Sequence, residues 1–381
     1  MLLPPSKLPE VGTTIFSVMT ALAQHHGAIN LAQGFPDYDV AEGLQDLVTN
    51  AIRSGLNQYA PMSGLPVLRE AVGSTYKVNP ETDVTITPGG TAALTTAILA
   101  FVSTGDEVII FEPAYDSYAP AVLLAGGRVC PVPLLPPNYQ PDWSAFARVL
   151  SSRTRLVIIN SPHNPTGSVW SRTDIDTLAG YLDGTSTLVL SDEVYESITF
   201  DGTEHVSVRH VPALNQRSLS VLSFGKMFHV TGWKVGACIA PQKLTEEFRK
   251  AHQFVSFSVH TPTQAALATW MTSTSVLAEL SEFFQKKRDL FRSALEGSPF
   301  TIRQCRGSYF QLLGTERVRR HNESDRMLAE RLTIENGVAS IPLSPFTSLP
   351  GMSDDALRFC FAKKDETLLA AAERLHRVPA V

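Results

Sequence analysis

The sequence predicts an α/β fold in which a large, doubly wound and mostly parallel sheet is joined to a smaller α+β domain. Three short β-branched segments that end in turn residues, GDEVIIFEP, TRLVIINSP and TSTLVLSDEV, are typical of parallel strands buried on both faces. Segments of helical character, such as TAALTTAILAFV and SRTDIDTLAGYL, lie between such strands. This alternation indicates helices on both faces of one sheet.

The alternating pattern extends from about residue 60 to about residue 240. Ser171 stands where the helix of SRTDIDTLAGYL should begin, and its hydroxyl can cap that helix. After about residue 275 the pattern changes to α+β. A long amphipathic helix, LAELSEFFQKKRDLFRSAL, leads to the strand-like segments SYFQLLG and ALRFCFA, with the helix DRMLAERLTIENG between them.

These patterns predict three regions. Residues 36–275 should form the large domain and residues 276–381 the small C-terminal domain. Residues 1–35 lack a core of their own, so we expect them to pack on the small domain and the active site.

Composition excludes several classes of function. The chain of 381 residues has a formal net charge of −5, so it offers no basic field for nucleic acid or an anionic membrane. No apolar run reaches the roughly 18 residues that span a bilayer. The start, MLLPPSKLPE, is interrupted by prolines and charges, unlike a secretory signal. We therefore expect a cytoplasmic protein without nucleic-acid or membrane partners.

The cysteines and histidines also suggest neither a disulfide framework nor a metal site. Cys130, Cys238, Cys305 and Cys360 are far apart in sequence and mostly flanked by apolar residues, which is typical of buried thiols in a reducing compartment. The ten histidines show no spacing that ligands of a metal adopt. No metal is expected.

Polar residues follow three successive strands of the predicted sheet. They are Asn164 in NSPHNPTG, Asp192 and Tyr195 in SDEVY, and Lys226 in SFGK. Ligands gather at the carboxyl ends of strands in open α/β sheets, so these side chains should converge on one small molecule. Gly89-Gly90-Thr91 stands between a strand and a helix, where backbone N–H groups can bind phosphate. A simple turn is the alternative interpretation of that glycine pair.

Together these motifs resemble those of class I pyridoxal-phosphate aminotransferases of fold type I. NSPHNPTG, SDEVYE, SFGK and TGWKVG carry the resemblance, and LAQGFPD, NQYAPMSG, GGTAAL, EPAYDSY and LRFCF follow the same family order. It extends from about residue 7 to the C-terminus. The start KLPEVGTTIFSVM is most similar to the branch of methionine aminotransferase and the kynurenine/glutamine transaminases. The resemblance implies pyridoxal 5′-phosphate as cofactor and a homodimer with active sites at the subunit interface.

The resemblance assigns roles around the cofactor ring. Lys226 matches the lysine that holds the cofactor aldehyde as a Schiff base and then moves the proton at the substrate Cα. Asp192 would keep the pyridine nitrogen protonated, while Tyr195 and Asn164 would hydrogen-bond the phenolic oxygen. Tyr115 fits the aromatic that stacks on the ring face. Without the resemblance, the same residues would be interpreted as a helix cap, core tyrosines and a turn asparagine.

A second set of residues matches the phosphate site. A dianionic phosphate accepts both a point charge and N–H donors. The resemblance implies that it is bound by the following residues, the last of them from the neighbouring subunit: Lys234, Ser223, Gly90, Thr91 and Tyr59. One departure is Ala92, where relatives often carry an acidic or amide residue; because the backbone makes the contacts there, we expect no effect on cofactor binding.

On the substrate side, Arg358 matches the arginine that binds the α-carboxylate, assisted by the Gly34 backbone N–H and by Asn164. Dicarboxylate-specific relatives supply a second arginine from the neighbouring subunit, in the segment that reads HQFVSFSVHTPTQ here, where Val259 and His260 are the nearest candidates. The side-chain pocket is expected to contain Tyr115, Phe16, Phe257, Val259, His260 and Phe346. It should accept methionine and aromatic side chains better than aspartate. A solvent-facing helix entry is the alternative for His260.

Three functions remain open from the sequence. The first is an aminotransferase acting on methionine or a large neutral amino acid through a ping-pong mechanism. The second is a C–S β-lyase acting on cysteine conjugates or cystathionine, because the same cofactor apparatus can eliminate from Cβ. The third is a non-catalytic ligand sensor of the same fold. Pyruvate and ammonia formed without a 2-oxo acid acceptor would indicate the lyase.

Overall fold

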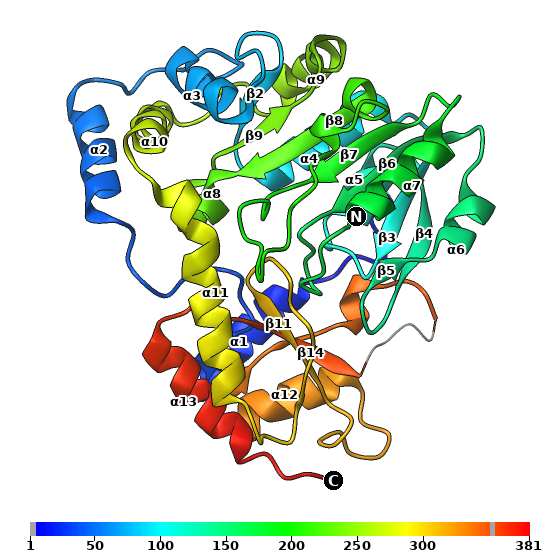
Figure 1. The fold of residues 1–381 in the computed structure, drawn as a ribbon, viewed down its shortest axis with the longest axis vertical. Coiled ribbons are helices and arrows are strands. Elements are labelled where there is room, and N and C mark those ends of the chain that lie inside the picture. The colour runs from blue at the N-terminus through cyan, green and yellow to red at the C-terminus, as the bar shows by residue number, and fades with distance from the viewer. Residues whose placement is uncertain (1–4, 351–354) are drawn as a thin grey trace.

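The computed structural model describes residues 5–350 and 355–381, and its largest sheet has eight strands (Figure 1). In spatial order these are β2 (Val84–Thr87), β9 (Gly236–Ile239), β8 (Ser218–Ser223), β7 (Leu188–Asp192), β6 (Thr154–Asn160), β3 (Glu107–Glu112), β4 (Arg128–Leu135) and β5 (Gln140–Pro141). The five strands from β8 to β4 run parallel. The outer pairings, β2 with β9, β9 with β8 and β4 with β5, are antiparallel. The predicted fold class is confirmed.

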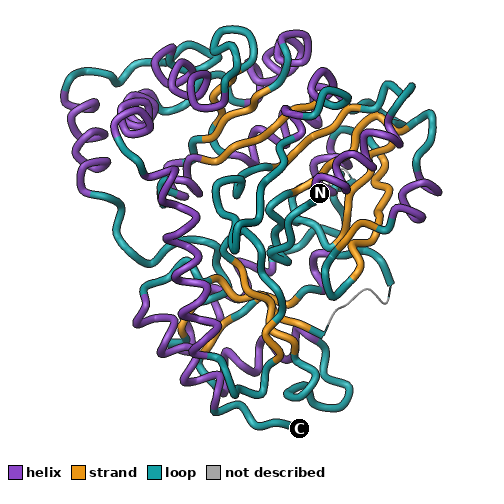
Figure 2. Tube along the Cα trace, in the orientation of Figure 1, coloured by secondary structure: helices purple, strands orange, loops and turns teal. Residues whose placement is uncertain are grey.

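Helices cover both faces of this sheet (Figure 2). Alternate strand residues such as Ile110, Ile158 and Leu190 share one core with α4 (Gly90–Phe101), α5 (Tyr118–Leu124) and α9 (Gln242–Val255). Their neighbours Ile109, Val157 and Val189 face the other side, toward α6 (Trp143–Val149) and α7 (Arg172–Leu182). Every residue of β3 and β8 is buried, and the interior of β3 (residues 108–111) is an apolar run, as expected for a strand covered on both faces.

The start of α7 agrees with the sequence prediction. The Ser171 hydroxyl accepts from the Asp174 N–H, and the Asp174 carboxylate accepts from the Ser171 N–H, which completes a capping box.

A third core joins α2 (Glu42–Arg53), α3 (Pro66–Tyr76) and α10 (Thr261–Ser273) to β2 and β9.

The second sheet is antiparallel, in the order β10 (Thr301–Ile302), β11 (Phe310–Gly314), β14 (Ala356–Cys360) and β13 (Ile341–Pro342). The helices α11 (Val276–Ala294), α12 (Asp325–Glu335) and α13 (Asp365–His376) belong to this half of the molecule, and α11 contacts α13. The strands and helices predicted after residue 275 are therefore present.

The N-terminal segment lies against C-terminal elements, where blue and orange meet in Figure 1. Helix α1 (Ile15–His26) packs on α12, and β1 (Ile29–Asn30) pairs in parallel with β12 (Val338–Ala339). The domain limits at residues 35 and 275 remain predictions. Residues 1–4 of the first predicted region and residues 351–354 of the third lie outside the described residues.

Two predictions about composition can be compared with the structure. All four cysteines are buried free thiols, as predicted. Within residues 5–350 and 355–381, no helix combines the length and apolarity needed to cross a membrane.

Candidate active site

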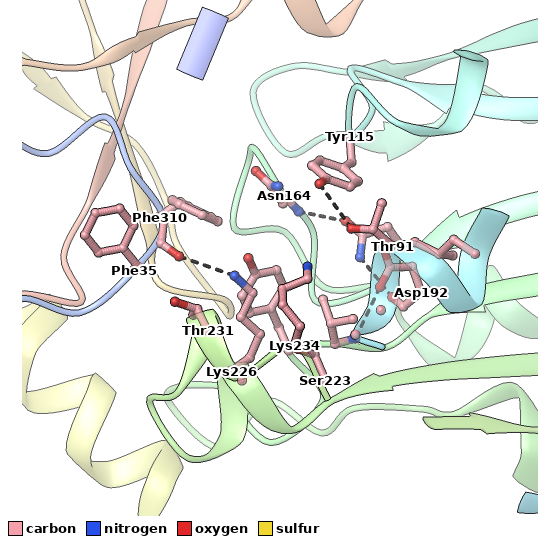
Figure 3. Close-up of a pocket in the computed structure, with 18 of the residues that line it drawn as sticks. Phe35, Thr91, Tyr115, Asn164, Asp192, Ser223, Lys226, Thr231, Lys234 and Phe310 are labelled. Carbon is pink, nitrogen blue, oxygen red and sulfur yellow. Dashed lines mark hydrogen bonds between the residues drawn. The ribbon is translucent and has the colours of Figure 1, made fainter. Parts of the chain in front are cut away.

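A cavity of about 280 Å³ lies at the carboxyl ends of β6, β7 and β8. Asn160 pairs with Asp192 in the β6–β7 register, so these strands end side by side and their following loops meet. Figure 3 shows how the labelled side chains face this cavity. The sequence-predicted residues that line it are Phe16, Gly34, Gly90, Thr91, Tyr115, Asn164, Asp192, Tyr195, Ser223, Lys226, Lys234 and Arg358.

Lys226 lies on α8 (Phe224–Met227), the single helical turn that follows β8. Its Nζ donates to the Gly34 carbonyl oxygen at 3.3 Å. Burial lowers the pKa of Lys226 to about 8, and the positive charges of Lys234 and Arg358 act in the same direction. Near physiological pH the neutral amine is therefore a minor form, but one far more abundant than in an ordinary lysine, and the neutral form is what a nucleophile or general base requires.

Asp192 ends β7 with its side chain buried at the centre of the cavity wall. Its Oδ2 accepts from the Tyr118 Oη at 2.6 Å, and its Oδ1 accepts from the Val194 N–H at 3.3 Å. Burial raises the pKa of this carboxyl to about 6, although the hydrogen bond from Tyr118 favours the ionised form. A cationic group placed beside Asp192 would supply the missing counter-charge. A protonated ring nitrogen fits this requirement.

An anion cradle lies at the N-terminus of α4. Gly89 has φ of 86° and leads into Gly90, the first helical residue. A Cβ at Gly89 would stand 3.2 Å from the Lys234 Nζ, so a side chain there would fill the cradle. Twelve helical residues stand behind this terminus, and their aligned N–H groups favour negative charge. Ser223 and Thr91 line the same end of the cavity, which suits a phosphate group.

Arg358 on β14 closes the opposite end. It is fully buried, and its Nη1 and Nη2 donate to the Asn164 Oδ1 and the Ala32 carbonyl, each at 2.7 Å. Its Nε has no partner, and its guanidinium lies 4.0 Å from the centre of the Phe310 ring. Burial lowers its pKa to about 10, so the group is still cationic at neutral pH. A buried cation with an unused donor is a site for a carboxylate.

Five predicted site residues do not line this chain's own cavity: Tyr59, Phe257, Val259, His260 and Phe346. Tyr59 is 83% exposed and forms an edge-to-face pair with Phe257. Val259 is buried in the core of α2, α3 and α10. His260 is exposed in this subunit and precedes α10, with its Nδ1 2.7 Å from the Thr263 Oγ1. Tyr59, Val259 and His260 were expected to serve a neighbouring subunit, and that remains a prediction.

Several residues that support the cavity were not predicted from the sequence. Tyr118 binds Asp192 and was already part of the EPAYDSY motif, so its spacing of three from Tyr115 could have indicated it. Asn160 donates to the Asp192 carbonyl and accepts from the Asn164 N–H. Tyr309 donates to the Gly34 carbonyl, but its segment SYFQLLG was interpreted only as a strand. Phe35 and Phe310 also line the cavity.

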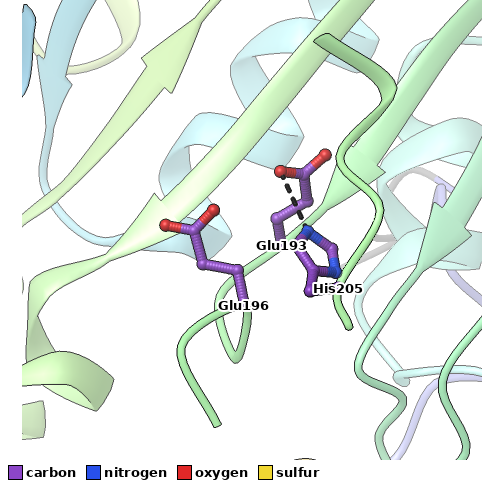
Figure 4. A group of neighbouring side chains, drawn as sticks. All are labelled: Glu193, Glu196 and His205. Carbon is purple, nitrogen blue, oxygen red and sulfur yellow. Dashed lines mark ion pairs between the residues drawn. The ribbon is translucent and has the colours of Figure 1, made fainter. Parts of the chain in front are cut away.

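A second ionisable cluster is formed by Glu193, Glu196 and His205, whose ligand-type atoms lie within 4.8 Å of one another (Figure 4). Arg209 reaches it too, with its Nη2 3.4 Å from Glu193 and 3.2 Å from Glu196. Burial opposes the ionised form of Glu193, but the charge of Arg209 and the His205 hydrogen bond outweigh it and lower the carboxyl pKa. We interpret the cluster as an ion-pair network, because Arg209 supplies the positive charge that a metal would bring.

The fold and the cavity together define a fold type I aminotransferase. The family model for aminotransferase class I and II matches residues 26–375, and the chain belongs to this family. Membership implies dependence on pyridoxal phosphate and small-molecule amino acid and oxo acid substrates.

Individual relatives agree with this family. Methionine aminotransferase of Escherichia coli is 48% identical over 99% of this chain and 99% of its own. Human kynurenine–oxoglutarate transaminase 1 is 32% identical over 93% of each chain. The crystal structure of YbdL from Escherichia coli, identified as having a methionine aminotransferase function, matches with a TM-score of 0.95 over 99% of this chain and 100% of that chain, at 48% identity. The predicted family and fold are confirmed.

Proposed function

We propose that this protein transfers the amino group of methionine, or of another large neutral or aromatic amino acid, to a 2-oxo acid with pyridoxal 5′-phosphate as cofactor. The observation that carries the proposal is one cavity lined by the low-pKa amine of Lys226 together with Asp192 and Arg358, whose charges both act on that amine. Bound there, the cofactor supplies an aldehyde that combines with amines and a ring that accepts electrons from the substrate Cα.

Each polar group of the cavity has a partner on the cofactor in this proposal. Asp192 would face the ring nitrogen, and the anion cradle would hold the phosphate through Gly90, Thr91, Ser223 and Lys234. Asn164 uses its Oδ1 for Arg358, which leaves its amide N–H groups for the phenolic oxygen beside Tyr195. Tyr115 would support the ring face.

On the substrate, Arg358 and the Gly34 N–H would bind the α-carboxylate. The Lys226 Nζ lies 3.3 Å from the Gly34 carbonyl, so the base stands next to the carboxylate site. Lys226 would remove the proton from the substrate Cα and return it during the second half-reaction, and its pKa near 8 suits both directions.

The specificity proposal rests on charge and shape. Of the described residues that line the cavity, the cationic ones are Lys226, Lys234 and Arg358, and each already has a role. A distal carboxylate would be buried without a counter-charge. The substrate side is lined by Phe16, Phe35 and Phe310. The Phe346 ring packs edge to face on Phe16, with ring centres 5.9 Å apart. The methionine and kynurenine activities in the names of the two relatives are consistent with such an aromatic pocket.

A homodimer is part of the proposal. Tyr59, Phe254 and Phe257 are 83%, 85% and 47% exposed, and such aromatic exposure favours a protein interface. In a dimer that covers this surface, Tyr59 of one subunit would lie at the anion cradle of the other. We further propose a cytoplasmic location, which the buried free thiols support.

An initial-rate panel tests the function. Purified protein is given methionine, phenylalanine, kynurenine, glutamine or aspartate with a 2-oxo acid, and kcat/KM is measured. Methionine and the aromatic donors should exceed aspartate; aspartate as the best donor would contradict the specificity. Pyruvate and ammonia from a cysteine conjugate without an acceptor, at a higher rate than any transfer, would indicate the lyase instead.

A further inference from the structure

Residues 31–37 form a strap that connects β1 to the large domain and crosses the substrate side of the cavity through Gln33, Gly34 and Phe35. Three of its carbonyl groups accept hydrogen bonds from buried side chains. Arg358 donates to Ala32 at 2.7 Å, Tyr309 to Gly34 at 2.6 Å and Lys363 to Phe35 at 2.7 Å. The donors are 0%, 1% and 3% exposed, respectively.

Gly34 needs such external support. A Cβ at this position would lie 2.9 Å from the Phe310 Cζ, so only glycine fits against that ring. Glycine is also the residue whose backbone is least restricted by its own side chain. The orientation of its peptide groups must therefore be set by neighbours, and Gly34 is where the substrate carboxylate is expected to bind.

Tyr309 touches both sides of the cavity. Its hydroxyl donates to the Gly34 carbonyl on the substrate side, and its ring packs against that of Tyr195 on the cofactor side. The two tyrosine rings are edge to face with centres 5.0 Å apart. The Lys226 Nζ lies 5.5 Å from the centre of the Tyr309 ring and 5.8 Å from that of Tyr195.

Lys363 supports the strap one residue further along. Its buried ammonium lies 4.7 Å from the centre of the Phe35 ring in addition to its bond to the Phe35 carbonyl. The end of the strap is held by the residues that follow Lys363. The Asp37 carboxylate accepts from the Lys364 N–H at 2.5 Å and from the Thr367 Oγ1 at 2.7 Å. Burying a lysine is costly unless its donors are used, and here the strap uses one.

We propose that Tyr309 is a positioning residue that sets the Gly34 peptide and the Tyr195 hydroxyl relative to each other, and that Lys363 holds the strap beyond Gly34. This inference rests on the proposed function, in which Gly34 and Tyr195 serve the substrate and the cofactor. Lys226 also donates to the Gly34 carbonyl, at the longer distance of 3.3 Å. When Lys226 acts on substrate or cofactor, Tyr309 remains to hold that carbonyl.

The test compares Tyr309→Phe and Lys363→Met with the wild type and with Tyr181→Phe. Tyr181 is a matched control, because its hydroxyl donates to the Trp143 carbonyl at 3.4 Å, on a different part of the fold. The first readout is backbone hydrogen–deuterium exchange of the peptide covering residues 31–37 in cofactor-bound protein without amino acid. Exchange should rise roughly two- to ten-fold in Tyr309→Phe and in Lys363→Met, the range for one lost hydrogen bond, and stay at the wild-type rate in Tyr181→Phe.

A second readout separates the two residues. The pH midpoint of the bound cofactor's visible absorption should move in Tyr309→Phe, which removes a hydroxyl that acts on the pKa of Tyr195, and stay in place in Lys363→Met. The KM for the amino donor should rise roughly two- to ten-fold in both variants, with a smaller change in kcat.

Exchange of residues 31–37 at the wild-type rate in Tyr309→Phe would overturn the proposal. Faster exchange by the same factor throughout the protein, or failure of that variant to fold, would also overturn it, since either result would show a merely structural role. Wild-type exchange in Lys363→Met would overturn the second part. These exchange measurements need no amino donor, so a wrong substrate assignment would leave them unaffected. Absence of any cofactor absorption would instead refute the proposed function.

Discussion

At the scale of single residues, the cavity holds groups whose charges are not balanced within the protein. Asp192 is a buried carboxyl whose pKa is raised to about 6, and Arg358 is a buried guanidinium with an unused Nε donor. Between them, Lys226 has a pKa lowered to about 8. The proposed cofactor and substrate would supply the charges that Asp192 and Arg358 lack, and would use the neutral amine of Lys226. Shifted pKa values of this kind concentrate at functional sites.

The pKa of Lys226 gives a prediction about cofactor loading. Only the neutral amine attacks an aldehyde, so the rate at which cofactor-free protein takes up pyridoxal phosphate should rise with pH and level off above about 8. Stopped-flow absorbance across pH 6 to 10 measures this rate. Lys226→Ala should remain folded but form no borohydride-stable adduct; an adduct found on Lys234 by mass spectrometry would reverse the assignment of the two lysines.

Substitutions of Asp192 and Lys234 should have different effects, because in the proposed function these residues face opposite ends of the cofactor. Asp192→Ala should lower kcat by a larger factor than it weakens cofactor binding, since it removes the counter-charge of the ring nitrogen. Lys234→Ala should mainly weaken cofactor binding, by about 1.5–3 kcal/mol for a charge-assisted contact. Equilibrium dialysis and kcat at saturating cofactor separate the two effects. A near wild-type kcat for Asp192→Ala would contradict the role of that carboxylate.

At the scale of elements, the central strands and several helices follow from local sequence, because runs such as those of β3, β6 and β7 are buried on both faces. The antiparallel pairing of β2 with β9 does not, since it joins residues about 150 positions apart in the chain and only the folded sheet brings them together. The same limit applies to the site. Motifs predicted the cavity wall, whereas the contact of Tyr309 with Gly34 spans 275 positions and has no local signal.

The ion-pair network behind β7 should be a stability element. Arg209→Met would leave the fully buried Glu193 without its main counter-charge, and we expect the free energy of unfolding to fall by about 3–5 kcal/mol. Arg172→Met, which breaks the exposed pair with Asp176, should change it by about 0–1 kcal/mol. Urea unfolding of both variants makes the comparison.

A double variant tests the cause of that loss. Because Glu193→Gln removes the charge that Arg209→Met leaves unpaired, the two changes together should destabilise the protein less than the sum of the single changes. Strictly additive losses would show that packing around Arg209, and not its charge, holds this region together.

At the scale of the whole molecule, the proposed homodimer, with each site shared between subunits, predicts complementation. Lys226→Ala homodimers should be inactive, and Tyr59→Ala homodimers should retain cofactor poorly. In a mixed dimer, one site combines both changes while the other has an intact Lys226 and an intact Tyr59. Co-refolded mixtures should therefore exceed the summed activity of the separate variants. If mixing adds nothing and size-exclusion chromatography still shows dimers, Tyr59 does not serve the neighbouring site.

The contacts of Arg358 also bear on how such a pocket can change during evolution. The Arg358 guanidinium, on β14 of the small sheet, donates to Asn164 in the loop after β6 and to Ala32 of the strap. Replacing it would disturb carboxylate recognition and the junction of three chain segments at once. Phe16 and Phe35, by contrast, contribute rings to the cavity without tying distant segments together by hydrogen bonds of their side chains. Substitutions at these phenylalanines can therefore change which amino donor is preferred. Recognition of the α-carboxylate by Arg358 is kept meanwhile, so the substrate remains an α-amino acid.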